Sequence, residues 1–335
     1  MTKDPLGKIF RVEKKLGRGD LFEFISFFPN GTRTVQVFQH ESFDGMGALL
    51  TESKKWTGAN ITVPLFNLKT HLSFIQILEG LRGLTKDMTP SITRWNHLNK
   101  GAKYSPEHLA WRVFSAEATQ KILSVAREQK VSLNTLLLYV FNSTVADNLL
   151  SPEQKDCRWL IPVNMRRTEP ERVFTGNRTS SVGLWFERDA TLSDIESEYR
   201  KSLNKWRALA ANTLAKASSF LSERVLYRLA RRRGESNFWI GSFTNLGVWS
   251  FPMITDGQNW PIALSVCPPA GTPCFPIGAG IVTWQGHLSV SLRLNAGLIS
   301  DNQALPEDLL DELTNRLSGM VKSSLETIRS SRAAH

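Results

Sequence analysis

The later part of the chain alternates between short apolar runs and helical patterns, and this succession constrains the fold more than any other feature. The runs with strand character span residues 111–116, 157–163, 179–187, 238–246, 260–266, 278–284 and 287–295. Helices are predicted over 115–129 with Ser115 as N-cap, after Ser132, over 191–232 as one or two helices, and from 301 or 306 to about 330. This order predicts an α+β fold with a mixed sheet and helices on one face.

The first third of the chain has a different pattern. Three extended patterns at residues 8–16, 21–28 and 33–40 are separated by the turn signals GRGD and PNGT, which predicts a small sheet. Residues 45–54 are predicted to be helical, and 56–105 form a poorly periodic crossing segment. We therefore expect a short N-terminal lobe, 1–105, and a larger C-terminal lobe, 106–335.

The formal net charge of +10 favours anionic partners, among them nucleic acid, membrane surfaces, phosphate groups and acidic proteins. The sharpest basic cluster comprises Arg228, Arg231, Arg232 and Arg233. A solvated helix face is the more common interpretation of such a cluster. No zinc finger, basic zipper or RNA-recognition signature is present, so we expect no nucleic-acid partner.

Cysteine content and hydropathy indicate the compartment. Cys157, Cys267 and Cys274 are odd in number and form no C-x-x-C pair, so neither a disulfide framework nor a zinc site is predicted. The first residues contain no apolar signal region, and no stretch approaches the roughly 18 unbroken apolar residues of a membrane span. We expect a cytoplasmic protein with no membrane span and no metal site.

His40, Asp44 and Gly45 form the pattern H-x-x-x-D-G at a predicted strand-to-helix turn. A histidine is the side chain best suited to take and return a proton near neutral pH. Asp44 is one turn away, where it can pair with a distant arginine and lock the turn, and Gly45 lets another backbone approach closely. The alternative is a surface histidine at a strand end, with Asp44 as the N-cap of the next helix.

The segment FQHESFDGMGALL resembles the HHxxxDG motif of the chloramphenicol-acetyltransferase-like superfamily of CoA-dependent acyltransferases. This superfamily includes condensation domains of nonribosomal peptide synthetases, wax-ester synthases and polyketide-associated acyltransferases. The segments LIPVNMRR, GNRTSSVGLWF and SFTNLG follow in the order typical of condensation-type members. The likeness covers most of residues 20–330, with Gln39 in place of the first family histidine. It implies a two-lobed α+β sandwich whose N-terminal lobe is abridged.

The resemblance also implies a mechanism, with His40 as the general base. His40 would take a proton from a hydroxyl or amine acceptor that attacks an acyl thioester on coenzyme A or on a carrier protein's phosphopantetheine. Asp44 and Gly45 would support the site structurally, with Arg166 as the partner of Asp44, and no tightly bound cofactor is implied. Donors of hydrogen bonds to the oxyanion would come from Ser242, Thr244 or Asn245.

The implied product is an ester or an amide, in small-molecule biosynthesis. Because the first lobe is short, an oligomer or a partner chain could complete it. The competing hypothesis is a catalytically silent, condensation-like domain that acts as a scaffold for a carrier protein or another partner.

Overall fold

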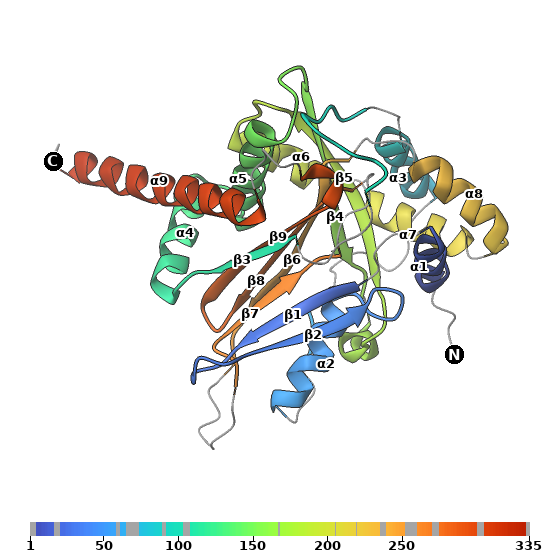
Figure 1. Ribbon diagram of the computed structural model, residues 1–335, viewed down its shortest axis with the longest axis horizontal. Coiled ribbons are helices and arrows are strands. Elements are labelled where there is room, and N and C mark those ends of the chain that lie inside the picture. The colour runs from blue at the N-terminus through green and yellow to red at the C-terminus, as the bar shows by residue number, and fades with distance from the viewer. Residues whose placement is uncertain are drawn as a thin grey trace.

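A six-stranded mixed sheet lies at the centre of the computed structural model (Figure 1). The structure describes residues 5–16, 21–57, 61–64, 74–88, 92–102, 108–166, 168–204, 206–218, 220–234, 239–251, 260–269, 275–299 and 305–332. The strand order is β3 (Leu109–Val113), β9 (His287–Leu294), β8 (Ile277–Trp284), β6 (Gly241–Trp249), β4 (Asp156–Asn164) and β5 (Thr179–Glu187). β6 runs parallel to both β4 and β8, and the other neighbouring strands are antiparallel. The predicted mixed sheet is confirmed.

A second, antiparallel sheet consists of β2 (Arg33–Gln39), β1 (Leu21–Phe27) and β7 (Ala263–Cys267), in that order. It packs on the six-stranded sheet, because β7 contacts β8 and β9. Arg293 of β9 also donates a 2.9 Å hydrogen bond to the Glu23 carboxylate of β1. A strand from the last third of the chain therefore completes the sheet that the first residues begin.

Of the helices that the structure describes, four cover the other face of the six-stranded sheet, and Figure 1 shows them on the side away from β1 and β2. They are α4 (Ala116–Glu128), α5 (Leu133–Asn148), α6 (Leu192–Asn204) and α9 (Pro306–Arg332). The prediction of helices on one face holds for these four, whereas α2 (Gly45–Thr57) packs on the opposite face. The predicted cap is confirmed, because Ser115 accepts from the Ala118 amide, and Ser132, after which a helix was predicted, likewise accepts from the Thr135 amide. Within the described residues, no helix combines the length and the apolar content that crossing a membrane requires.

Strand β8 contributes to two separate cores. Ile277, Ala279 and Ile281 pack with the helices, whereas Val282 and Trp284 pack with the small sheet and with α2 (Gly45–Thr57). Alternate side chains of a strand point to opposite faces, so a strand that is covered on both faces reads as an unbroken apolar run.

A further group of helices lies beside β5: α7 (Arg207–Ser218) contacts that strand and also α3 (Phe74–Met88) and α1 (Pro5–Lys15). α1 in turn contacts α8 (Glu223–Gly234). Two short 3-10 helices, η1 (Glu169–Val173) and η2 (Ala296–Leu298), precede β5 and follow β9.

Three sequence expectations need correction. Residues 8–16, predicted as extended, lie mainly in α1, where Ile9 and Val12 are at helical spacing, with Leu16 one residue past the end of the helix. The segment 191–232 contains three helices instead of one or two, and Trp206, with φ of +59°, lies between α6 and α7. The crossing segment 56–105 contains the unpredicted helix α3.

Two of the three cysteines lie in the described part of the chain. Cys157 and Cys267 are buried free thiols, and burial raises the pKa of each thiol to about 12. Cys274 lies outside the described residues.

Candidate active site

His40 follows the last residue of β2 and begins the turn that leads into α2. The amides of Ser42 and Phe43 both donate to the Gln39 carbonyl at 3.0 Å, which closes the turn. The imidazole is half-buried. The ring of Phe10, from α1, stacks on it at a centroid distance of 4.2 Å, and Phe22 of β1 meets it edge-on at 5.5 Å. Two aromatic rings therefore fix the plane of the imidazole.

Asn177 holds the main chain of His40. Its side-chain Nδ2 donates to the His40 carbonyl oxygen at 3.2 Å and lies 3.5 Å from His40 Nδ1, at the outer limit of a hydrogen bond. Its Oδ1 accepts from the Thr179 amide at 3.2 Å, which orients the Nδ2 group toward the histidine. Asn177 is only 1% exposed. The resemblance included it in the segment GNRTSSVGLWF but gave it no role, and its contact with His40 spans 137 residues.

The structure places Asp44 and Arg166 in a two-pronged ion pair. Arg166 Nη1 lies 3.0 Å from Asp44 Oδ2, and Arg166 Nη2 lies 3.0 Å from Asp44 Oδ1. Asp44 is 1% exposed and Arg166 is fully buried. A buried pair of this kind stabilises a fold only if further hydrogen bonds satisfy the remaining atoms of both groups.

Those further hydrogen bonds are present. Asp44 also accepts from the Gly47 amide at 2.7 Å, the Arg178 amide at 2.6 Å and the Thr179 hydroxyl at 3.0 Å. The Arg166 guanidinium also donates to the carbonyls of Phe174 and Gly176 and to the Asn164 side chain. Asp44 thus caps α2 and anchors the loop 174–179 at the same time. Both carboxylate oxygens are engaged in this network.

Two glycines bring this turn against neighbouring segments. A Cβ on Gly45 would lie 2.7 Å from Leu246 Cδ2 of β6, a side-chain atom that can shift. A Cβ on Gly47 would lie 1.8 Å from the Thr175 carbonyl oxygen, which belongs to the anchored loop. Gly47 is therefore the glycine that the site requires, although the sequence pattern drew attention to Gly45.

The three candidate oxyanion residues on β6 do not share one environment. Asn245 donates to the Asn134 side chain of α5, and its Oδ1 accepts from the Gly247 amide at 2.7 Å. Asn245 therefore faces the helical layer. Because successive side chains of a strand point to opposite faces, Ser242 and Thr244 lie on the opposite face of β6. Leu246 contributes to the core on that face and meets Gly45.

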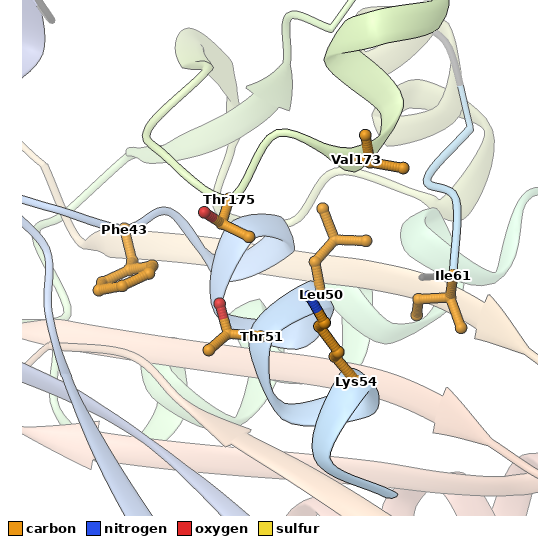
Figure 2. Close-up of a pocket in the computed structure, with 7 residues that line it drawn as sticks. All are labelled: Phe43, Leu50, Thr51, Lys54, Ile61, Val173 and Thr175. Atoms are coloured by element: carbon orange, nitrogen blue, oxygen red, sulfur yellow. The ribbon is translucent and has the colours of Figure 1, made fainter. Parts of the chain in front are cut away.

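A pocket of about 470 Å³ lies beside the turn (Figure 2). Helix α2 contributes Leu50, Thr51 and Lys54 to its lining, and Ile61, Val173, Thr175 and Phe43 complete it. Phe43 comes three residues after His40, but His40 does not line this pocket. The pocket is therefore adjacent to the candidate base and not centred on it.

No protein-family model and no curated protein matches the sequence. Solved structures do match. The condensation domain of the monacolin K polyketide synthase is 13% identical, with a TM-score of 0.53 over 90% of this chain and 73% of that one. A variant starter condensation domain of rhizomide synthetase, in complex with C8-CoA and Leu-SNAC, is 12% identical, with a TM-score of 0.53 over 86% and 65%.

The third structure is the wax ester synthase/diacylglycerol acyltransferase from Marinobacter aquaeolei VT8, which is 13% identical. Its TM-score is 0.52 over 86% of this chain and 66% of that one. The chain thus spans 65% to 73% of the length of these structures. At this identity the comparisons show the fold: the chain has the fold of condensation domains and CoA-dependent acyltransferases, as the resemblance implied.

Proposed function

We propose that the chain is an acyltransferase in which His40 is the general base. One observation carries the proposal: in a fold shared with condensation domains and a wax ester synthase, a histidine follows β2 on a turn that the buried Asp44–Arg166 pair fixes. Asn177 and two aromatic rings hold that histidine in place. A preorganised base of this kind is what acid–base catalysis requires.

In the proposed reaction, His40 removes the proton from a hydroxyl or amine acceptor as the acceptor attacks the thioester carbonyl. The new C–O or C–N bond forms, the C–S bond breaks, and the leaving thiolate takes the proton back from His40. Asp44 takes no part in proton transfer, because both of its oxygens are engaged with Arg166, Gly47 and the loop 174–179. Ser242 and Thr244 are the better candidates for stabilising the oxyanion, since Asn245 is engaged with α5.

The proposed donor is an acyl group carried on coenzyme A or on the phosphopantetheine of a carrier protein. The rhizomide synthetase domain, which has this fold, was solved with C8-CoA. The net charge of +10 suits either anionic donor. A biosynthetic role follows by analogy with the polyketide and peptide synthetase domains of the same fold.

Release of free thiol tests the proposal. A panel of acyl-CoA and acyl-carrier thioesters is offered with pooled alcohol and amine acceptors, using the wild type, His40→Ala and the exposed-histidine control His97→Ala. We expect acceptor-dependent turnover that falls by about 100-fold or more in His40→Ala, as for a missing general base, and persists in His97→Ala. Turnover that does not depend on His40 would remove the mechanism. Circular dichroism checks that each variant is folded.

A second candidate function, a catalytically silent scaffold, is favoured by one observation. Phe10 lies on the face of the His40 ring, and His40 does not line the pocket beside it. The scaffold predicts tight carrier-protein binding that is unchanged in His40→Ala, together with no turnover for any donor in the panel.

A further inference from the structure

Helix α8, together with the two residues at 220–221, presents a surface that is both basic and apolar. Phe220 is 91% exposed and Leu229 is 53% exposed, so both large apolar side chains contact solvent over much of their surface. Leu221 and Val225 are also well exposed. The arginines exposed on the same helix are Arg224, Arg228 and Arg231.

The other side of α8 is occupied by α1. Leu226 is buried, and Glu223 pairs with Lys15 at 2.5 Å and with Arg11 at 3.7 Å. Successive residues of a helix are rotated by about 100°. This rotation places Arg224 and Arg228 opposite the buried side, with Val225 and Leu229 along one flank.

The charge of this surface has one sign. Glu223 is the only acidic residue in the α8 sequence ERVLYRLARRRG, and its carboxylate is engaged by α1. The side chains of Arg232 and Arg233, which belong to the basic cluster seen in the sequence, lie outside the described residues. In Figure 1, α8 lies at the edge of the molecule beside α1, away from the six-stranded sheet.

Three kinds of anionic partner can be compared with this surface. A nucleic acid would use the arginines and leave Phe220 and Leu229 without a role. A stable protein partner covers about 800 Å² on each side. One face of a 12-residue helix, about 18 Å long and 10 Å wide, offers roughly 180 Å². Membrane binding scales with the apolar area that inserts and with the attraction of basic side chains to anionic lipids, so a single helix face can be enough. A bilayer also accepts apolar side chains just below the phosphates that arginines bind.

We propose that α8, with Phe220 and Leu221, binds the surface of an anionic phospholipid bilayer. The helix lies in the plane of the headgroups, with Phe220, Val225 and Leu229 inserted among the acyl chains and Arg224 and Arg228 at the phosphates. This binding is independent of the acyl-transfer reaction proposed above, because none of these residues belongs to the His40 site.

Vesicle flotation with the full chain tests the proposal. We expect binding to vesicles of phosphatidylcholine mixed with phosphatidylglycerol, weaker binding at higher salt, and little binding to phosphatidylcholine alone. The double variant Arg224→Gln/Arg228→Gln should bind about 25-fold more weakly, at about fivefold per arginine. Phe220→Ser/Leu229→Ser should also lose binding. The matched controls Arg127→Gln/Lys130→Gln and Val35→Ser/Val248→Ser change exposed residues elsewhere and should bind as the wild type does.

Three results would overturn the proposal. These are equal binding to neutral and anionic vesicles, no binding to either, and binding to anionic vesicles that is unchanged in Phe220→Ser/Leu229→Ser. Binding of an acidic carrier protein through the same arginines, without vesicle binding, would assign the surface to a protein partner instead. Retained circular dichroism shows that a loss of binding is not a loss of folding.

Discussion

At the scale of single residues, the Asp44–Arg166 pair makes the sharpest prediction. Asp44→Asn leaves a buried guanidinium without its counter-charge, which should lower the free energy of unfolding by about 3–5 kcal/mol. The matched control is Asp311→Asn, which breaks the exposed pair with Arg112 and should cost about 1 kcal/mol or less. Urea unfolding measures both values. If both variants lost a similarly small amount of unfolding free energy, the buried pair would not anchor the turn.

A second prediction at this scale concerns Glu196, whose carboxylate accepts hydrogen bonds from the Ser132 amide and from the Ser132 and Thr135 hydroxyls. Burial alone would raise the pKa of Glu196, but hydrogen bonds from Thr135, Ser132 and Arg200 outweigh it and lower the pKa to about 2. The folded-state pKa lies below the ordinary value of 4.5. The stabilisation is therefore complete above about pH 4.5 and is lost as the pH falls toward 2.

Glu196→Gln should consequently lower the unfolding free energy at pH 7 by about 3 kcal/mol and flatten its decline between pH 4.5 and 2. The exposed residue Glu128 offers the control Glu128→Gln, which should leave that decline as steep as in the wild type. Urea unfolding at a series of pH values makes the comparison. An unchanged slope in Glu196→Gln would contradict the assignment.

At the scale of elements, α1 acts as a cover over His40. Phe10 stacks on the imidazole, while Arg11 pairs with Glu41 and Glu223, and Lys15 also pairs with Glu223. The stacked Phe10 ring holds the imidazole in one orientation and so limits how readily a reagent reaches its ring nitrogens.

Phe10→Ala should make His40 react faster with diethyl pyrocarbonate, by about two- to tenfold, which corresponds to the loss of one aromatic stacking contact. Arg11→Ala should act in the same direction but less, because exposed ion pairs contribute little. The control Phe220→Ala removes an exposed ring that lies elsewhere. Peptide mapping by mass spectrometry follows His40 specifically. Equal rates in Phe10→Ala and the wild type would show that α1 does not shield the ring.

At the scale of the whole molecule, local sequence signals predicted most helices and strands but not which elements pack against one another. Ser115 and Ser132 marked two helix starts correctly, because N-caps are determined by neighbouring residues. Residues 8–16 were misassigned because a short segment with apolar residues at several spacings fits both periods, and packing against α7 and α8 decides between them.

The site shows the same division between local and long-range information. The turn at His40 was visible in the sequence, and the resemblance supplied Arg166 as the partner of Asp44. Phe10 and Asn177 could not be foreseen, since their contacts with His40 depend on the packing of distant segments. Strand alternation alone separates Asn245 from Ser242 and Thr244, but which face Asn245 occupies depends on the position of α5.

The completion of the small sheet by β7 has a consequence for the order of folding. β1 lies in the first 30 residues, yet its second neighbour, β7, begins at Ala263, and the Glu23–Arg293 ion pair spans 270 residues. Lys8 of α1 likewise meets the Leu221 carbonyl across 213 residues. Contacts so distant along the chain close large loops and slow folding. During synthesis, the surroundings of the turn that carries His40 therefore cannot be completed until most of the polypeptide has been made.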